Sequence, residues 1–240
     1  MICSFTQTYS NNRGELFHYH SKDKSDIYFR NKLDKNYYVF HNSSTEYKVD
    51  IINNNKYFDE VKNMEIISYD NISYTHSFYN TLMKIKRDGF KYMFFLQDDV
   101  FSLVNESRMN ELLDFVKNNT FNMMNIESIN ANTNAGILYS SDEIKIYDTT
   151  SDDFKNKGWW AFDDGPYVAN VDYLLNHVYD TTFFSQNDIW TAEHYLNQKI
   201  GHNKIQRLTA NISFFRRIGI VGPNAWTRED ELANLNKMFM

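Results

Sequence analysis

A short apolar run followed at once by two carboxylates is the feature of this sequence that most limits its fold. Tyr92-Met-Phe-Phe-Leu96 has no polar residue at alternate positions, and Gln97, Asp98 and Asp99 follow it. A strand with one face in water alternates polar and apolar residues, so this run predicts a strand covered on both faces. Because open α/β sheets bind ligands at the carboxyl ends of their strands, we expect the two carboxylates at a ligand-binding edge.

The rest of the chain alternates strand-like and helix-like segments. Phe78, Leu82 and Ile85 recur at helical spacing, and Gly89 is suited to end their helix. The expected strands are 1–9, 37–41, 64–69, 92–96 and 210–215, with a hairpin of 135–139 and 143–147. The expected helices are 71–89, 107–117, 168–178 and 188–200, followed by an irregular end. This order predicts an α/β fold with a mostly parallel central sheet flanked by helices.

Size and charge narrow the function further. With 240 residues, of which 42% are hydrophobic, the chain can bury one sizeable core but is short for two full domains. A formal net charge of -6 disfavours nucleic-acid binding, since phosphate backbones are held mainly by Lys and Arg. Cys3 is the single cysteine, so no internal disulfide can form. We expect one domain that binds a small partner and no nucleic acid.

The composition also bears on location. No run approaches the roughly 20 apolar residues of a membrane span, and the start of the chain lacks the apolar run of a signal peptide. We therefore expect a soluble, cytoplasmic protein without a membrane span. The many Asn, Lys, Ile and Tyr residues are typical of an AT-rich genome, such as that of a large DNA virus, a protist or an AT-rich bacterium. For a viral protein, the compartment would be the host cytoplasm.

Asp98 and Asp99 have a chemistry that suits a divalent cation. Carboxylate oxygens are hard ligands, which Mg²⁺ and Mn²⁺ prefer. A cation held there can bridge the phosphates of a nucleoside diphosphate and stabilise it as a leaving group. The alternative is that the pair only ends a strand and caps the next turn.

The stretch from Tyr74 to Met83, together with Phe95 to Phe101, resembles the core of GT-A glycosyltransferases. In that family a helix precedes a hydrophobic strand that ends in a DxD motif. Gln97 stands here where the motif has its first Asp. The resemblance implies one GT-A domain over residues 1–240, with the donor-binding part at about 1–140 and the acceptor-binding part at about 141–240. It implies that Asp99 is the metal ligand.

The same resemblance implies contacts to a nucleotide-sugar donor, UDP- or GDP-linked. In the family the first strand and its loop hold the base and ribose, and hydroxyl or amide groups can read a base edge while tyrosine stacks on it. Asp70 and Asn80, later in the chain, and Gln97 and Asp98, directly before Asp99, are further candidates for donor contacts. The implied donor-binding residues are Thr6, Gln7, Thr8, Tyr9, Asp70, Asn80, Gln97 and Asp98.

Residues 158–168 are the most unusual stretch, with two Trp, two Asp and a Gly-Pro turn. Aromatic faces pack against the C–H face of a sugar, while carboxylates accept its hydroxyl hydrogens. The stretch resembles the loop and helix that line the acceptor cleft in several GT-A families, which implies acceptor contacts from Trp159, Trp160 and Tyr167. The alternative is a tryptophan pair in the core beside a solvated turn.

Phe184-Ser-Gln-Asn-Asp-Ile-Trp190 resembles an acidic motif that begins a helix in the family. In inverting enzymes this acid takes the proton from the acceptor hydroxyl, which makes Asp188 the candidate base and Asp163 and Asp164 its substitutes. A helix N-cap is the alternative role for Asp188. Some GT-A enzymes take a further metal ligand from the C-terminal region, for which His202 is available.

These features predict transfer of a hexose from a nucleotide diphosphate sugar to a glycan hydroxyl, dependent on Mn²⁺ or Mg²⁺ and inverting if Asp188 is the base. A sugar-phosphate nucleotidyltransferase is the first alternative. It is disfavoured because residues 9–14 contain a single glycine and no Gly-rich phosphate loop. A non-catalytic carbohydrate-binding module using the Trp pair is another. A metal hydrolase is the third alternative, because His18 and His20, and also His194 and His202, could supply imidazole ligands to a metal.

Overall fold

The computed structural model describes residues 1–8, 19–127, 136–149, 165–179, 207–218 and 228–239, and the statements below concern these residues. Its strands are β1 (Ile2–Thr8), β2 (Lys35–His41), β3 (Met64–Tyr69), β4 (Tyr92–Gln97), β5 (Val100–Ser102), β6 (Met123–Asn125), β7 (Gly136–Ser140), β8 (Lys145–Thr149), β9 (Tyr167–Asn170), β10 (Arg207–Ala210) and β11 (Phe215–Arg217). In the described part of the chain, nine strands form one sheet in the order β3-β2-β1-β4-β9-β6-β10-β8-β7. β5 and β11 form a separate antiparallel pair.

Most strands of the large sheet point the same way. β1 is parallel to β2 and β4, β2 is parallel to β3, and β6 is parallel to β10. β9 runs antiparallel between β4 and β6, and β8 runs antiparallel between β10 and β7. The carboxyl ends of β1 to β4, β6 and β10 therefore lie along one edge of the sheet.

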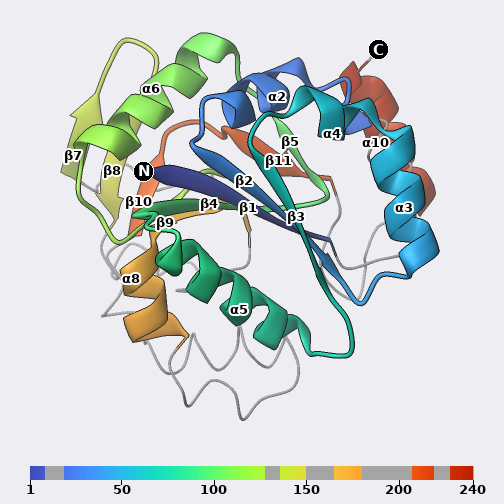
Figure 1. Cartoon of the computed structure of the whole chain (residues 1–240). Coiled ribbons are helices and arrows are strands. Elements are labelled where there is room, and N and C mark those ends of the chain that lie inside the picture. Colours follow the sequence, from blue (N-terminus) through green and yellow to red (C-terminus); the bar gives the residue numbers. More distant parts are fainter. Residues whose placement is uncertain (9–18, 128–135, 150–164, 180–206, 219–227, 240) are drawn as a thin grey trace.

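Helices cover both faces of this sheet (Figure 1). They are α2 (Lys24–Asn31), α3 (Thr45–Asn54), α4 (Lys56–Glu60), α5 (Tyr74–Arg87), α6 (Glu106–Asn118), α8 (Val171–Tyr173), the π-helical turn η1 (Leu174–Val178) and α10 (Arg228–Phe239). α5 and α8 pack on one face, and α2, α3, α4 and α6 pack on the other. None of the described helices combines the length and apolar character needed to cross a membrane.

Polar side chains fix where the helices begin. Five helices on the two faces, α2 to α6, each start at an N-cap whose side chain accepts a backbone N–H and satisfies one unpaired donor of the first turn. α5 ends at Arg87 and its C-cap Asp88 is followed by Gly89, which has φ +86°, a left-handed angle that glycine adopts without strain. The N-cap residues are Asp23, Ser44, Asn55, Ser73 and Asn105.

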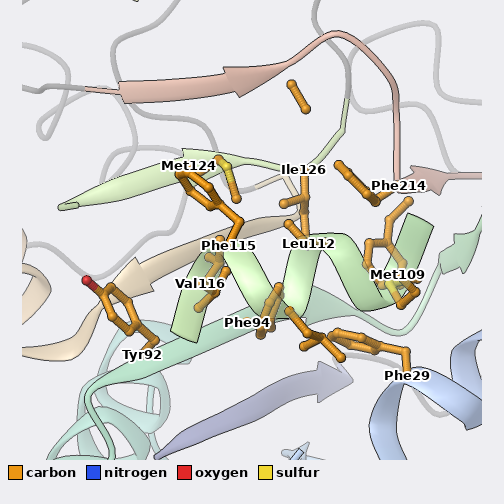
Figure 2. Close-up of a cluster of buried hydrophobic side chains, with 14 of the residues drawn as sticks. Phe29, Tyr92, Phe94, Met109, Leu112, Phe115, Val116, Met124, Ile126 and Phe214 are labelled. Carbon is orange, nitrogen blue, oxygen red and sulfur yellow. The ribbon is translucent and has the colours of Figure 1, made fainter. Parts of the chain in front are cut away.

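Strand β4 contributes to the cores on both faces. Met93 and Phe95 are buried on the α5 face, while Phe94 and Leu96 are buried on the α6 face. Figure 2 shows the second core, where Phe94 lies among side chains of α6 and Phe29 of α2. Coverage on both sides explains why the sequence of this strand does not alternate, and it confirms the expectation of a doubly covered strand.

The sheet order reverses between β1 and β4. The helix α2 leaves β1 on one face and leads to β2, whereas α5 enters β4 from the other face. The carboxyl ends of β1 and β4 are therefore the topological switch point, where open α/β sheets form their ligand-binding crevice.

The structure corrects several predicted elements. The predicted helix 168–178 begins as strand β9 and becomes helical only at Val171, because residues 167–170 insert between β4 and β6. The predicted strand 210–215 spans the gap between the end of β10 and the start of β11. The predicted irregular end contains α10, and α2, α3 and α4 were not predicted. The helix 188–200 lies outside the described residues.

Candidate functional site

Asp98 and Asp99 lie at the switch point, in the turn between β4 and β5. Their exposed fractions are 3% and 6%. Thr8, at the end of β1, donates its hydroxyl hydrogen to Asp98 Oδ2 at 2.6 Å and so ties the two strands together. The backbone N–H of Ile218 donates to the Asp99 carbonyl oxygen at 2.9 Å. The carboxylate pair thus lies at the carboxyl edge beside the first strand, where the sequence places it.

The donor set suits a cation that arrives with phosphate. Mg²⁺ is commonly held by one or two carboxylates plus substrate phosphates and water. Among the described residues no three His, Cys, Asp or Glu side chains converge. Within the described residues, a cation at this edge would have two carboxylates at most from the pair, and phosphate or water would have to supply further oxygens.

A buried ion pair lies beneath this edge on the α2 face. The Arg30 Nε donates to Asp26 Oδ2 at 2.8 Å, and both side chains are almost fully buried. Arg30 Nη1 also donates to Thr6 Oγ1 at 2.8 Å, and the Tyr57 hydroxyl donates to Asp26 Oδ2 at 2.9 Å. Burial acts to lower the pKa of Arg30, but the adjacent Asp26 raises it above its usual value. The network joins α2 and α4 to the first strand.

His20 and Asp23 connect this network to the turn. His20 Nε2 lies 2.7 Å from the Asp98 carbonyl oxygen, and its ring stacks on Phe101 at 4.4 Å. Asp23 Oδ2 accepts the Ser102 N–H at 2.7 Å. Burial lowers the pKa of His20. Burial, and next the charge of Asp26, raise the pKa of Asp23 to about 7.

Polar groups also follow the edge on the α5 face. Gln7 Nε2 donates to Ser77 Oγ of α5 at 2.6 Å. Asn125 of β6 and Thr209 of β10 are neighbours in register and are 3% and 1% exposed. Within the described part of the chain, no hydrogen-bond partner meets Gln7 Oε1, Asn125 Oδ1 or Thr209 Oγ1. Such atoms are costly to bury, so they are places where a polar ligand would be favourable.

The remaining predicted donor residues occupy different environments. Thr6 is buried against Arg30, and Gln97 is half-buried beside Gln7 in the β1–β4 register. Asp70 is exposed after β3, with one carboxylate oxygen 3.4 Å from Lys48 Nζ. Asn80 is exposed on α5. The structure therefore brings Thr8, Gln97, Asp98 and Asp99 together and leaves Asn80 apart on the helix surface.

Of the predicted acceptor and catalytic residues, only Tyr167 is described. It begins β9, is fully buried, and its ring lies 5.2 Å from that of Phe95. Tyr9, Asp163, Asp164, Asp188, Trp159, Trp160 and His202 lie outside the described residues. Their roles stay predictions.

Four residues near the edge were not assigned to the nucleotide-sugar site by sequence, although His20 was considered as a ligand of a metal hydrolase. Asp23 carries a detectable signal, since an Asp three residues before another acid at a helix start is typical of an N-cap. The sequence gives no comparable sign for His20, Asn125 or Thr209, because their positions depend on which strands and helices become neighbours.

Comparison with known proteins points to the fold. No protein-family model matches the sequence, and no curated protein matches it. The structure is similar to 4-diphosphocytidyl-2C-methyl-D-erythritol synthase from Anaerococcus prevotii, with a TM-score of 0.55 and 10% identity over 100% of this chain and 99% of that one. It is also similar to residues 1–349 of S. aureus TarS in complex with UDP, with a TM-score of 0.56 and 11% identity over 99% of this chain and 64% of that one.

The fold is of the GT-A type. A putative glucose-1-phosphate thymidylyltransferase from Bacillus anthracis shares it, with a TM-score of 0.52 and 7% identity over 100% of this chain and 95% of that one. TarS 1–349 has also been solved with UDP-GlcNAc. At these identities the likeness concerns the fold alone, and it confirms the predicted GT-A architecture.

Proposed function

We propose that this GT-A chain is a glycosyltransferase that moves a hexose from a nucleotide diphosphate sugar, UDP- or GDP-linked, to a hydroxyl of a glycan. The observation that carries the proposal is the position of Asp98 and Asp99 at the switch point between β1 and β4. The UDP and UDP-GlcNAc complexes of TarS, which has the same fold, support a nucleotide-sugar donor. The chain covers 64% of the TarS 1–349 structure and 39% of a longer TarS structure.

In the proposed reaction, the acceptor oxygen bonds to the anomeric carbon of the donor and the bond from that carbon to the diphosphate breaks. The nucleoside diphosphate leaves with the bonding electron pair. The hydroxyl proton passes to a base, for which we propose Asp188, with Asp163 and Asp164 as substitutes; this assignment makes the reaction inverting. Trp159 and Trp160 are the proposed acceptor contacts. Tyr167, predicted with them, is the least supported, because its ring is fully buried against Phe95.

A divalent cation, Mn²⁺ or Mg²⁺, would neutralise the departing diphosphate. We propose Asp99 as its protein ligand and His202 as a second, with Asp98 beside the donor. The two adjacent, nearly buried carboxylates support this assignment. Of the donor contacts that sequence indicated, Thr8 and Gln97 are best supported because they lie beside Asp98, and Gln7, Tyr9 and Asp70 are proposed with them. Thr6, buried against Arg30, and Asn80, on the surface of α5, are the least supported.

The test is a thermal-shift screen of UDP- and GDP-sugars with and without Mn²⁺. At a donor concentration near 100 times Kd, binding stabilises the native state by about 2.7 kcal/mol. For a chain of this size, that raises Tm by roughly 5–10 °C. A flat response to every donor, with and without the metal, would contradict the proposal.

Asp99→Asn should abolish the metal-dependent part of the shift, because an amide is a weaker cation ligand than a carboxylate. Asp172→Asn is the matched control, since Asp172 is an exposed carboxylate on α8 at the opposite edge of the sheet, paired with Lys86. The control should shift like the unmodified protein. A carbohydrate-binding module would instead keep its glycan affinity in the Asp99→Asn protein.

A sugar-phosphate nucleotidyltransferase is the second candidate. It is supported by the synthase from A. prevotii, which has the same fold over 99% of its own length. The two activities differ in their substrates. A nucleotidyltransferase consumes a nucleoside triphosphate and a sugar phosphate and releases pyrophosphate, whereas the proposed enzyme releases a nucleoside diphosphate from the preformed donor. Assaying both products distinguishes them.

A further inference from the structure

The segment that carries the two carboxylates is held through its backbone. Residues 98–102 comprise a turn and the three-residue strand β5, which pairs only with the equally short β11 in the described part of the chain. Two side chains from outside both strands add hydrogen bonds to this segment. One reaches the Asp98 carbonyl oxygen and the other reaches the Ser102 N–H.

His20 is the first of these side chains. A carbonyl oxygen can only accept, so Nε2 must carry the proton in the 2.7 Å contact with Asp98. The ring is 2% exposed and lies nearly parallel to Phe101, at 13° and 4.4 Å between centroids. His20 therefore fixes one backbone oxygen of the turn through a buried hydrogen bond.

Asp23 is the second side chain that holds residues 98–102. Its Oδ2 accepts from the Ser102 N–H at 2.7 Å, and its Oδ1 accepts from the Asp26 N–H at 3.0 Å. One carboxyl group thus joins the start of α2 to strand β5. The side chain is 3% exposed, and Asp26 lies next to it.

Helix capping alone does not explain Asp23. A buried carboxyl beside another acid is unfavourable, and Ser or Asn caps a helix as well as Asp does. What Asp adds is a second oxygen, which reaches Ser102 while the first caps α2. The Asp23 carboxyl group therefore forms one hydrogen bond to strand β5 and one to the start of α2.

We propose that His20 and Asp23 are positioning residues, which together hold residues 98–102 so that the Asp98 and Asp99 carboxylates meet the donor diphosphate in a fixed place. The inference rests on the proposed function for the identity of the ligand. We call His20 and Asp23, with their hydrogen bonds to the Asp98 carbonyl oxygen and the Ser102 N–H, the clamp. The existence of the clamp rests on these two contacts. Neither residue touches the reacting atoms in this proposal.

Two variants of His20 separate its hydrogen bond from its packing. His20→Phe keeps a ring on Phe101 but removes the donor to the Asp98 carbonyl. His20→Gln keeps a donor at similar reach but loses the ring. Asp23→Asn keeps one acceptor oxygen and loses the other.

Two controls change similar contacts at the opposite edge of the sheet. Asn170→Ala removes a side-chain acceptor of the Tyr173 N–H, a contact of 3.0 Å. Asp34→Asn alters a carboxylate that accepts the Ile2 N–H at 2.8 Å. Both lie at the amino end of parallel strands β1 and β4, away from the carboxylate pair.

The first measurement is amide hydrogen exchange of residues 98–104, which needs no ligand. We expect exchange of this segment to rise about tenfold or more in His20→Phe and Asp23→Asn, as for one lost buried hydrogen bond, and to stay unchanged in the two controls. His20→Gln should restore most of the protection. Unchanged exchange in both clamp variants would overturn the proposal, even if the protein binds nucleotide sugars.

The second measurement is the Kd of UDP with Mn²⁺ by calorimetry, followed by kcat and KM for the donor. We expect Kd and donor KM to rise about tenfold in His20→Phe, with recovery in His20→Gln and little change in the controls. If exchange rises but nucleotide affinity does not, the clamp is structural only and the positioning role is wrong. If the unmodified protein binds no nucleotide at all, the proposed function fails, and with it the positioning role, while the exchange data still decide whether the clamp exists.

Discussion

Arg30 is the residue whose burial says most about how the first strand is held. It is 1% exposed, and its guanidinium contacts Asp26, Thr6 and Ser4. A buried ion pair of this kind adds little more to folding stability than an apolar pair of similar size would, but removing one partner leaves an uncompensated buried charge. The network therefore makes the position of β1 sensitive to a single side chain.

We predict that Arg30→Met lowers the free energy of unfolding by about 3–5 kcal/mol, because Asp26 would be left charged and buried. The double variant Asp26→Asn, Arg30→Met should lose less, since the amide still accepts from Tyr57. Urea denaturation measures both. Lys24→Met is the control on the same helix: Lys24 pairs with Glu60 in water, so its loss should cost at most about 1 kcal/mol. Equal losses in the two single variants would contradict this account.

Asp23 gives a prediction about pH. Its pKa is about 7 in the folded protein and near 3.8 in an unfolded chain. Between these values the folded state holds a proton that the unfolded state has lost, so stability falls as pH rises. From pH 5 to pH 8 the loss from this residue should be on the order of 2–3 kcal/mol.

The measurement is urea denaturation at both pH values for the unmodified protein and Asp23→Asn. Because Asn does not titrate, the variant should show a smaller loss of stability between pH 5 and pH 8. The neighbours His20, Asp26, Arg30, Tyr57 and Asp98 are present in both proteins, so their contribution cancels to first order. Identical pH profiles would show that Asp23 does not titrate in this range.

Sequence predicted part of the site at the residue scale. Asp98 and Asp99 were placed at the carboxyl edge, and Thr8 beside the same edge, because a buried strand and a first strand end there. The hydroxyl of Thr6 was expected near the donor too, but it accepts from Arg30 in the interior. No sequence pattern signals that a helix will direct an arginine inward, since that depends on the tertiary position of α2.

Among the elements, α5 has the most clearly defined end. Gly89 follows it with φ +86°, and a Cβ built there would lie 3.2 Å from Met1 Cε, the end of a flexible side chain. The cost of a side chain at this position is therefore mainly backbone strain.

We predict that Gly89→Ala costs about 1–2 kcal/mol, the penalty for an L-residue in the left-handed region. Gly136→Ala is the control, because a Cβ at Gly136 meets nothing within 4 Å and its φ is not in that region. The control should lie within about 0.5 kcal/mol of the unmodified protein. Thermal unfolding of both variants measures the difference, and a neutral Gly89→Ala would be inconsistent with the described helix end.

Element prediction succeeded where a pattern was long or strongly apolar. β4, α5 and α6 were found because each carries a clear run or helical spacing. β9 was misassigned because Val168, Val171 and Leu174 fit a helix equally well, and only insertion between β4 and β6 makes the first residues extended. α3 and α4 carry weak apolar patterns, with one buried hydrophobic residue each, Ile51 and Tyr57.

At the scale of the whole molecule, the C-terminal helix packs next to the candidate site. Leu235 of α10 is fully buried in a cluster with Tyr19, Phe101 and Ile218. The Tyr19 hydroxyl donates to Asn236 Oδ1 at 2.7 Å, and the ring of Phe239 lies 5.6 Å from that of Phe101. Segments from both ends of the chain therefore meet behind β5.

We predict that Leu235→Ala lowers stability by about 2–5 kcal/mol and also weakens UDP binding, because Phe101 is two residues from Asp99. Met238→Ala is the control on the same helix, since Met238 is 36% exposed. It should change either quantity little. Calorimetric Kd and denaturation midpoints report both effects; a Leu235→Ala protein with unchanged stability would contradict the described packing of α10.

The antiparallel insertion of β9 has a consequence for synthesis of the chain. β4 pairs with β1 on one side and with residues 167–170 of β9 on the other. The ribosome adds residues 167–170 only after some seventy more residues, so this second edge of β4 stays unpaired until then. At about 5–20 residues per second this takes several seconds. During that time β4, a strand with the apolar sequence Tyr92-Met-Phe-Phe-Leu96, presents an unpaired edge, which is the kind of surface at which chains aggregate.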